Sequence, residues 1–460
     1  MKTFPKNKFV KIEPRLRLRK EEHCVLVIDT LSGRFYEATP SQAVIITLFD
    51  GNATISKVTD LVSEIYSDTF ENSHNVVLET LTQLEDNRWV EFHDTPGIVM
   101  QSYETSEFMF NPVIKEGINV YKSPITMEFM LTKGCNFECV YCYMSAKNSH
   151  ELNKQTMSYQ TFSKIVEQAK EMEVKRAFLA GGEPLLSKDI IKMVQLLISC
   201  DIFPYISTNG SLLTRELIDE LYSSGLRFIQ LSFDSSNPIT FDTLTGKQNS
   251  FKGVMKNLIL LKNKGMQVRI KSVVTKHNWK DIGKLIDFCC ELEIFDLEIV
   301  PSLPSADGRD NFSDIELNKI ELLELREIIQ KKRIEKSNFN FGYRDPLLIW
   351  PSPKPVNVCG GGMTSLVIMP DGQASICDMM SEKKFSLGNL HKFTLNDVWN
   401  SKGVNSLRNL SSDLLHEECK NCKHLGLCRT GCFNLSKMTY GDYFAPDPRC
   451  PVRINQNKVI

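Results

Sequence analysis

The feature that most constrains the fold is a regular alternation of strand-like and helix-like segments between residues 125 and 301. The strand-like segments are short apolar runs, and the segments between them, such as 161–172 and 189–198, have apolar residues at helical spacing. Alternating strands and helices form parallel sheets, and six such units favour a sheet curled into a partial barrel. We therefore predict an α/β protein with a partial (β/α)6 barrel. The predicted strands are 125–131, 176–180, 203–207, 227–233, 267–274 and 296–301.

A separate small domain is predicted before the barrel, in residues 1–95. A hairpin around Ser32-Gly33 and three amphipathic helices give the pattern of a winged helix-turn-helix with a β-sheet in front of it. The first helix has a capping box, Thr39-Pro40-Ser41-Gln42, with proline at its first position. The predicted elements are strands at 15–19, 24–29 and 33–38, helices from Thr39 to Gly51, around 58–65 and around 77–84, and a strand at 89–92.

The charge of this domain argues against nucleic-acid binding. Residues 52–92 contain two basic residues, Lys57 and Arg88, against eight acidic ones, a balance of −6. Phosphate contacts need a basic surface instead. We predict that the domain binds a peptide, which adds as a strand along the edge of its sheet. The whole chain has a net charge of −1, which indicates no polyanionic partner.

The remaining boundaries follow from changes in pattern. No apolar run follows the basic start of the chain, and no window approaches the apolar length of a membrane span. We therefore expect a cytoplasmic protein without membrane association. The predicted order is a peptide-binding domain (1–95), a linker (96–121), the barrel core (122–310), a helical bridge (311–349) and a cysteine-rich domain (350–460).

Fourteen cysteines, ten of them in three tight groupings, indicate metal binding or catalysis rather than disulfides in a chain of this size without a secretory signal. The segment GCNFECVYCYM places Cys135, Cys139 and Cys142 directly after the first barrel strand. Three thiolates suit a four-iron cluster whose fourth iron is open to another ligand. A zinc site is the alternative, but structural zinc takes four protein ligands and no fourth is evident nearby.

The thiol spacing, with Tyr141, resembles the signature of the radical S-adenosylmethionine (SAM) superfamily. Gly181-Gly182-Glu183-Pro184 begins 39 residues after Cys142 (181 − 142) and is similar to that family's GGEP motif. The next two strands end in STNG and SFDS, which resemble its segments for the SAM carboxylate and ribose. All of these lie at the C-terminal ends of strands, where barrel active sites form. The resemblance implies Cys135, Cys139 and Cys142 as catalytic cluster ligands and SAM contacts from Tyr141, Gly181, Gly182, Glu183, Pro184, Ser207, Asn209, Ser232 and Asp234.

In that family the cluster donates an electron to the SAM sulfonium, which gives methionine and a 5′-deoxyadenosyl radical. The amine and carboxylate of SAM bind the open iron, and Glu183 would accept a hydrogen bond from the amine. The cofactor carries the difficult step, and the protein supplies position and excludes water.

Seven further cysteines lie in the C-terminal domain. Their array, C-x12-G-x4-C followed by C-x2-C-x5-C-x3-C and a last cysteine, resembles the SPASM domain, which binds two auxiliary four-iron clusters. A zinc ribbon is the alternative for the central four, but it leaves the other three unexplained. The resemblance implies Cys359, Cys377 and Cys432 as ligands of auxiliary cluster I, and Cys419, Cys422, Cys428 and Cys450 as ligands of auxiliary cluster II.

Some relatives supply a fourth ligand to cluster I from a cysteine upstream of the first, but residues 350–355 contain none. We hypothesise that cluster I has an open iron that receives a substrate thiolate; a ligand of another type, or a cysteine from elsewhere, is the alternative. Four cysteines have no predicted role and are expected to behave as small buried hydrophobes: Cys24, Cys200, Cys289 and Cys290.

The N-terminal domain resembles the PqqD-like recognition element of enzymes that modify ribosomally made peptides (RiPPs). The order of recognition element, barrel and SPASM domain is most similar to the sactipeptide maturases, including subtilosin-type enzymes. Gly308-Arg309 and the segment 385–390 have counterparts there. The resemblance implies three four-iron clusters and SAM as cofactors. It also implies a precursor peptide as partner, with its leader on residues 9–92 and its core at the barrel mouth.

The implied reaction is an intramolecular thioether from a cysteine sulfur to a carbon of the precursor, a step in bacteriocin biosynthesis, with flavodoxin or ferredoxin as reductant. Carbon–carbon cross-linking, epimerisation, decarboxylation of a peptide and formylglycine formation in a sulfatase are rival enzymatic readings. A zinc-binding winged-helix regulator is a rival of another class.

Overall fold

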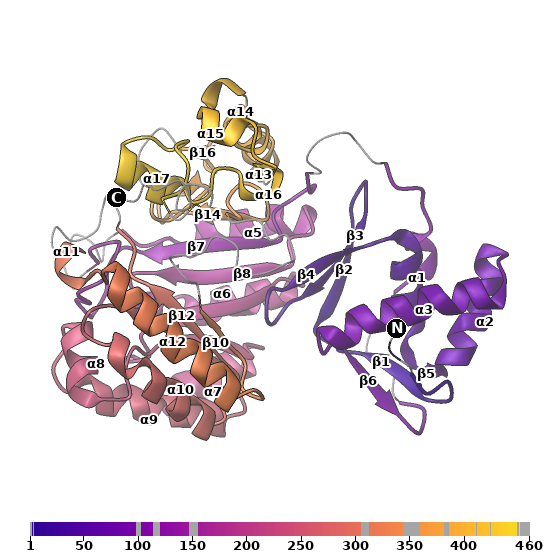
Figure 1. The fold of residues 1–460 in the computed structure, drawn as a ribbon, viewed down its shortest axis with the longest axis horizontal. Helices are drawn as coiled ribbons and strands as arrows, with labels where there is room; N and C mark the ends of the chain where they lie inside the picture. Colours follow the sequence, from indigo (N-terminus) through magenta and orange to yellow (C-terminus); the bar gives the residue numbers. More distant parts are fainter. Residues whose placement is uncertain are drawn as a thin grey trace. The chain divides into compact units, whose positions relative to one another are not determined.

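The computed structural model describes residues 2, 4–97, 103–113, 120–146, 155–304, 312–343, 359–380, 386–410, 412–423, 425–448 and 450. The chain forms two compact units, Met1–Lys122 and Ser123–Ile460, and each has its own hydrophobic core (Figure 1). In the described part of the chain, every helix is too short or too polar to cross a membrane.

The described residues of the N-terminal unit form two three-stranded antiparallel sheets and three α-helices. One sheet has the order β2-β3-β4 and includes the predicted hairpin, which turns at Gly33 with a positive φ of 76°. The other has the order β5-β1-β6. The elements are β1 (Phe9–Ile12), β2 (Leu16–Lys20), β3 (Val25–Asp29), β4 (Phe35–Ala38), α1 (Pro40–Leu48), β5 (Asp50–Thr54), α2 (Ile55–Tyr66), α3 (Phe70–Asp86) and β6 (Val90–His93).

Helix α1 begins with the predicted capping box, since Thr39 and Gln42 exchange bonds between side chain and backbone. The predicted end at Gly51 is wrong, because the chain leaves the helix earlier and forms β5. The carboxylate of Asp50 accepts bonds from the next backbone N–H groups, which competes with helix formation. Strand β5 then exists only by pairing with β1, a contact that a local sequence pattern does not encode.

Part of the predicted linker packs in the N-terminal unit. The short helix η1 (Thr105–Phe108) contacts α1, and Phe108 is buried in the core of the unit. The hydroxyl of Tyr103 accepts a bond from the Leu18 backbone of β2 at 3.1 Å. These aromatic side chains explain why residues 103–113 do not behave as a free linker, and they cover the outer edge of β2.

The C-terminal unit is built on one ten-stranded sheet with the order β13-β12-β11-β10-β9-β8-β7-β14-β15-β16 (Figure 1). Every pairing from β13 to β14 is parallel, as expected for an α/β fold. The strands are β7 (Thr126–Thr132), β8 (Arg176–Gly181), β9 (Phe203–Thr208), β10 (Phe228–Ser232), β11 (Gln267–Val274), β12 (Asp296–Pro301), β13 (Phe341–Tyr343), β14 (Ser365–Ile368), β15 (Gln373–Ser375) and β16 (Gly388–Asn389).

Strands β7 to β12 are the six predicted strands, whereas the extension of the sheet at both ends was not predicted. Strand β14 comes from the cysteine-rich domain and pairs with β7 along its whole length, from Ser365 opposite Thr126 to Ile368 opposite Phe129. The cysteine-rich domain therefore shares a sheet with the barrel. This pairing fixes where its cysteines lie relative to the loop that follows β7.

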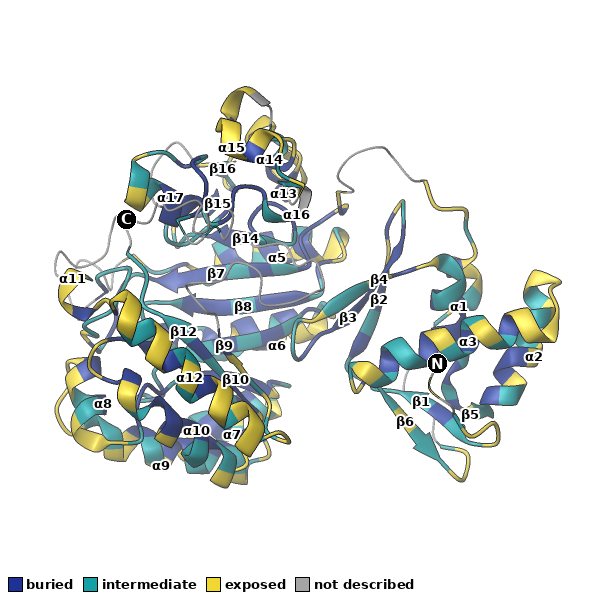
Figure 2. Cartoon of the chain, viewed as in Figure 1, coloured by how far each residue is buried: buried dark blue, intermediate teal, exposed yellow. Residues whose placement is uncertain are grey.

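Helices cover the sheet with their buried faces turned toward it (Figure 2). Phe162 of α5, for example, packs on Phe129 of β7 with ring centroids 4.8 Å apart. The predicted helical bridge contains α12, whose polar surface is interrupted by buried Leu325 and Ile329. The helices are α5 (Tyr159–Glu171), η2 (Pro184–Leu186), α6 (Ile190–Ser199), α7 (Arg215–Ser223), α8 (Pro238–Thr245), α9 (Ser250–Asn263), η3 (Trp279–Asp281), α10 (Ile282–Glu291), α11 (Phe312–Ile315), α12 (Lys319–Glu335), α13 (Leu395–Trp399), α14 (Lys402–Arg408), η5 (Ser412–Leu414), α15 (Glu417–Lys420), α16 (Leu425–Cys428) and α17 (Phe433–Tyr440).

Candidate cluster and SAM site

The loop that carries the first three cysteines leaves the C-terminal end of β7 and is held by the end of α8. The backbone N–H groups of Glu138 and Val140 donate to carbonyls at the end of α8, at 3.1 and 2.9 Å. Gly246 follows α8 with a positive φ of 63°, and a Cβ there would lie 2.5 Å from the Glu138 carbonyl oxygen. Only glycine therefore allows this close approach, which fixes the path of the loop.

The two glycines of the GGEP segment pack against the same loop. A Cβ on Gly181 would lie 2.4 Å from the Thr132 carbonyl oxygen, and one on Gly182 would lie 2.0 Å from that of Gly134. The chain itself therefore requires glycine at both positions, because the close neighbour of each is backbone. The pair locks the end of β8 against the start of the cysteine loop.

Glu183 joins two of the predicted segments, GGEP and STNG. Its fully buried carboxylate accepts bonds from the Thr208 hydroxyl at 2.7 Å, from the Asn209 backbone at 2.8 Å and from the Leu185 backbone at 3.1 Å. Burial raises the pKa of Glu183 to about 7, and these hydrogen bonds oppose the rise. In this structure the carboxylate fastens the end of β9 to the turn after β8. Its contact with the SAM amine stays a prediction.

Asn209 and Asp234 connect the strand ends to the cysteine loop. The Asn209 side chain donates to the Asn136 side chain at 2.9 Å and to Cys135 Sγ at 3.8 Å. Asp234 accepts a short bond from the Tyr141 hydroxyl and one from the Val273 backbone at 2.7 Å. Burial raises the pKa of Asp234 to about 6, and both bonds oppose this. Motif residues that are far apart in sequence are thus bonded to one another.

The three loop thiols have the properties of cluster ligands. Burial raises the pKa of Cys135 to about 11 and that of Cys139 well above its ordinary value, and the charge of Cys142 adds to both shifts. The thiols therefore lie close enough to interact, and ionised thiolates here need a positive partner. The irons of a four-iron cluster would supply that positive partner.

The C-terminal cysteines form the two predicted groups. Burial raises the pKa of Cys377 well above its ordinary value, and the charges of Cys359 and Cys432 contribute. Burial likewise raises the pKa of Cys428 to about 12, with contributions from the other members of the second group. The structure thus brings the members of each predicted set near one another, and the members of the second set are Cys419, Cys422, Cys428 and Cys450. Their roles as ligands of two auxiliary clusters stay a prediction.

A buried cation next to the first auxiliary group provides an independent test of fit. Arg429 is 3% exposed and lies near enough to Cys359 for the thiolate to influence it, while burial lowers the pKa of the guanidinium. Its Nε and Nη1 atoms have no hydrogen-bond partner within the described residues. A buried, partly unsatisfied cation calls for a nearby negative charge, which a thiolate-ligated iron cluster would supply.

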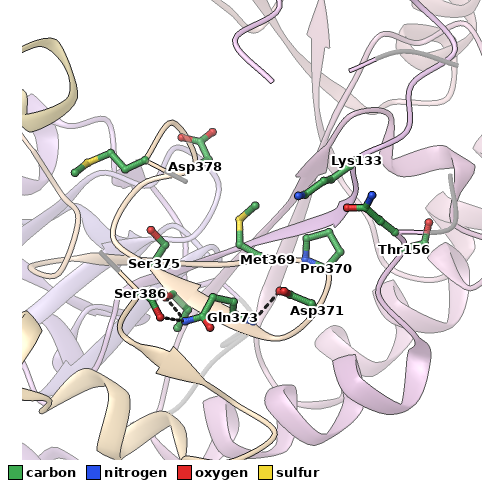
Figure 3. Close-up of a pocket in the computed structure, with 12 residues that line it drawn as sticks. Lys133, Thr156, Met369, Pro370, Asp371, Gln373, Ser375, Asp378 and Ser386 are labelled. Atoms are coloured by element: carbon green, nitrogen blue, oxygen red, sulfur yellow. Dashed lines mark hydrogen bonds between the residues drawn. The ribbon is translucent and has the colours of Figure 1, made fainter. Parts of the chain in front are cut away.

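A pocket of about 340 Å³ opens between the barrel and the C-terminal part of the sheet (Figure 3). Lys133, two residues before Cys135, lines it from one side, and Asp378, next to Cys377, lines it from the other. The Tyr143 hydroxyl donates a short bond to the Asp378 carboxylate. Sequence reasoning missed Lys133, Tyr143 and Asp378, although the last two directly follow predicted ligands and that adjacency was a usable signal.

The other predicted residues have plainer surroundings. Ser207 accepts a bond from the Gln230 side chain at 3.0 Å, Pro184 is buried in η2, and Ser232 is half-buried at the end of β10. Cys289 is buried, as expected for a cysteine without a ligand role, whereas Cys200 and Cys290 are only half-buried. The segment 350–355, Gly308-Arg309 and Phe385 lie outside the described residues.

Comparison with family models identifies the two chemical domains. Residues 129–289 match the radical SAM superfamily, and residues 359–423 match the iron-sulfur cluster-binding SPASM domain. The chain therefore carries an α/β radical SAM fold followed by a SPASM domain. SAM and four-iron clusters are the cofactors that these two domains imply.

Individual relatives extend the similarity. Mycofactocin maturase MftC from Mycolicibacterium smegmatis is 27% identical over 333 residues, 71% of this chain and 83% of MftC. Streptococcus suis SuiB, solved with S-adenosylmethionine, covers 96% of this chain and 100% of its own, with a TM-score of 0.66 and 16% identity. Native anSMEcpe with bound AdoMet covers 70% and 93%, with a TM-score of 0.58 and 19% identity. At these identities, the structural matches show a shared fold.

Proposed function

We propose that the protein is a radical SAM maturase that forms thioether cross-links, from a cysteine sulfur to a carbon, within a ribosomally made precursor peptide of the sactipeptide type. The observation that carries the proposal is the pocket lined by Lys133 and Asp378. Lys133 is two residues before Cys135 and Asp378 directly follows Cys377, so the pocket is lined by chain neighbours of two different predicted cluster sites. A peptide in this pocket would lie between the SAM site and auxiliary cluster I. SuiB has been solved with its precursor peptide SuiA, at a TM-score of 0.65 and 18% identity over 96% of this chain, and this supports a peptide substrate.

We assign the cofactors to the three cysteine groups. Cys135, Cys139 and Cys142 would hold the SAM-binding cluster, and the bonded network of Tyr141, Glu183, Asn209 and Asp234 would shape the SAM pocket around it. When bound, SAM and this cluster supply a 5′-deoxyadenosyl radical that removes a hydrogen atom from carbon. The SPASM domain would hold auxiliary cluster I on Cys359, Cys377 and Cys432, and auxiliary cluster II on Cys419, Cys422, Cys428 and Cys450.

The residues of the pocket account for the rest of the bond-forming step. A thioether requires that the peptide lose a hydrogen atom from carbon and a proton and an electron from the thiol. Asp378 is the carboxylate that lines the pocket next to Cys377, so it can receive the thiol proton, and Tyr143 keeps it in place. The surplus electron would pass to an auxiliary cluster. We further propose flavodoxin or ferredoxin as the electron donor to the enzyme.

The N-terminal unit would bind the leader of the precursor. Strand β4 is an edge strand of the sheet β2-β3-β4, and no other strand of the described residues pairs with its outer side. The outer edge of β2 is covered by Tyr103, so β4 is the edge available for strand addition. Holding the leader on the same chain would raise the local concentration of the core peptide at the barrel.

Anaerobic co-expression with a short cysteine-containing precursor encoded nearby tests the proposal. Mass spectrometry should show a loss equal to a pair of hydrogen atoms for each cross-link, and iodoacetamide should no longer label the cysteine that forms it. A modified peptide that keeps its reactive thiol would indicate carbon–carbon cross-linking instead. A precursor unchanged by an enzyme that cleaves SAM would overturn the assignment of substrate.

The hypothesis that auxiliary cluster I has an open iron can be tested separately. The motivation is the absence of cysteine from residues 350–355. Adding the precursor should change the EPR signal of an auxiliary cluster, while a precursor with serine in place of the acceptor cysteine should not. Identical spectra with both peptides would count against an open site.

A further inference from the structure

A third group of metal-ligating side chains lies in the N-terminal unit. His23 and Cys24 belong to the turn between β2 and β3, and Glu37 lies on β4, which pairs with β3. Glu37 is opposite Leu26, so it shares a face of the sheet with Cys24, two residues before Leu26. A ligand atom from each of the three residues lies within 4.8 Å of the others, and His23 Nε2 is 3.9 Å from Glu37 Oε1.

The histidine has an unsatisfied buried nitrogen. Its side chain is 6% exposed, and Nε2 has no hydrogen-bond partner within the described residues. Buried polar atoms normally have a partner, so an orphan that faces a thiol and a carboxylate indicates a missing ligand. The ring also stacks on Tyr121, with centroids 5.9 Å apart, which limits how far it can turn toward another acceptor.

The surrounding residues also fix the positions of the other two candidate ligands, Cys24 and Glu37. Cys24 is only 5% exposed, and its sulfur lies within 4.8 Å of the ligand atom of His23. Glu37 Oε1, the oxygen nearest His23, accepts a bond from the Tyr121 hydroxyl at 2.6 Å. Tyr121 therefore orients both the imidazole and the carboxylate, as partners behind metal ligands commonly do.

The donor set selects the kind of metal. Imidazole, thiolate and carboxylate together suit zinc or a similar transition metal, whereas magnesium and calcium prefer oxygen ligands alone. Tetrahedral zinc has bonds of about 2.0–2.3 Å, so its ligand atoms lie roughly 3.5 Å apart. The observed separations reach this geometry through movements of about an ångström, and Glu37, 45% exposed, can make them.

We propose that His23, Cys24 and Glu37 form a zinc-binding site in the N-terminal unit, with water in the fourth position. With three protein ligands and a water, this would be an open zinc site and not a closed structural one, and it would join the turn between β2 and β3 to the edge strand β4. It does not depend on the cluster sites, because its three side chains belong to the N-terminal unit, although it shares β4 with the proposed leader-binding edge. Cys24 is buried, as the sequence predicted, and the proposal adds a ligand role to this residue.

Zinc K-edge absorption on the anaerobically reconstituted full-length holoenzyme tests the site, because the iron clusters are silent at this edge. After excess zinc has been removed by a weak chelator, the wild type should retain a zinc with one sulfur at about 2.3 Å and nitrogen or oxygen ligands at about 2.0–2.1 Å. Cys24→Ser should remove the sulfur contribution, and His23→Ala should lower the zinc content. Cys200→Ser, which alters a cysteine outside every group, should leave both unchanged.

Glu37→Gln keeps the test decisive if either core variant fails to fold, since Glu37 is partly exposed. Competition with a chromophoric chelator should show zinc affinity reduced by about tenfold or more, the size expected when the shell of a metal site is damaged. Equal zinc content and an unchanged sulfur contribution in Cys24→Ser would overturn the proposal. A wild type that holds no zinc after chelation would also overturn it, and so would unchanged zinc affinity in Glu37→Gln.

Discussion

The SAM site and the C-terminal cysteine array differ in what holds them together. Around the first cluster, side chains from successive strand ends bond to one another, as Glu183 does with Thr208 and Asp234 with Tyr141. In the array, Arg429 and Thr430 keep buried polar atoms without partners among the described residues. We infer that the protein alone organises the SAM site, whereas the array depends on its clusters to complete it.

The largest effect is expected from Cys139→Ala. Loss of one of the three thiolates should abolish SAM cleavage, because no other cysteine of the loop can replace it. The barrel should still fold, since its network does not need this thiol. Production of 5′-deoxyadenosine, measured by liquid chromatography after chemical reduction, should fall below detection, while Cys200→Ala should match the wild type. Cleavage at the normal rate in Cys139→Ala would refute the assignment of this loop.

Cys450→Ala should separate the two sites. This change removes a ligand from the second auxiliary group and leaves the loop after β7 intact. We expect SAM cleavage to continue while cross-linked product is lost, and both are measured in one reaction by chromatography and mass spectrometry. Normal product formation would show that the grouping of Cys419, Cys422, Cys428 and Cys450 is wrong.

Removing iron should affect the array more than the SAM site. After chelation under anaerobic conditions, backbone amides in residues 419–448 should exchange with deuterium about tenfold faster or more, because their local stability depends on the clusters. Peptides from 176–210, which contain the Glu183 network, should change by about twofold or less. Equal acceleration in both regions, measured by mass spectrometry, would remove the distinction between them.

The sequence predicted the strands of the barrel because each is a local apolar run. Strands β13 and β14 were missed because they are short and are defined by pairing with β12 and β7, far away in sequence. The end of α1 was mispredicted for the same reason. The helix was expected to continue to Gly51, but pairing of β5 with β1 takes the place of its last turn.

The candidate site also has parts that could be predicted from the sequence and parts that could not. The ligand residues were predictable because their spacing carries the chemistry, but the bond between Tyr141 and Asp234 joins residues 93 positions apart and depends on how the sheet curves. Cys24 is buried as expected, but burial alone does not exclude the ligand role proposed for it. Only the register of β3 with β4 brings Glu37 beside it.

Arg429→Met should change the redox properties of the array without changing the SAM site. Loss of a buried positive charge near Cys359 favours the oxidised state of the nearby cluster, so its reduction potential should fall by tens of millivolts, where about 59 mV is tenfold for one electron. Redox titration followed by EPR measures this shift, and Arg429→Lys should largely restore the wild-type value. Identical potentials in the wild type and Arg429→Met would place the cation away from any cluster.

The smallest effect is expected from Tyr141→Phe, which removes one hydroxyl from the network of the SAM site. Asp234 keeps the Val273 bond but loses its other donor, so the apo-protein should lose about 1 kcal/mol of stability. Burial raises the pKa of Asp234 to about 6, above its ordinary value, so its stabilising contribution is complete at low pH and is lost as pH rises through 6. Without the tyrosine bond, the ionised carboxylate of Asp234 is less favourable still. The loss of stability caused by Tyr141→Phe should therefore be larger at pH 7.5 than at pH 5. Thermal unfolding of the apo-protein at these two pH values, with Tyr159→Phe as the matched control, should show that difference. A loss independent of pH would mean that the tyrosine stabilises the loop by packing and not through the carboxylate.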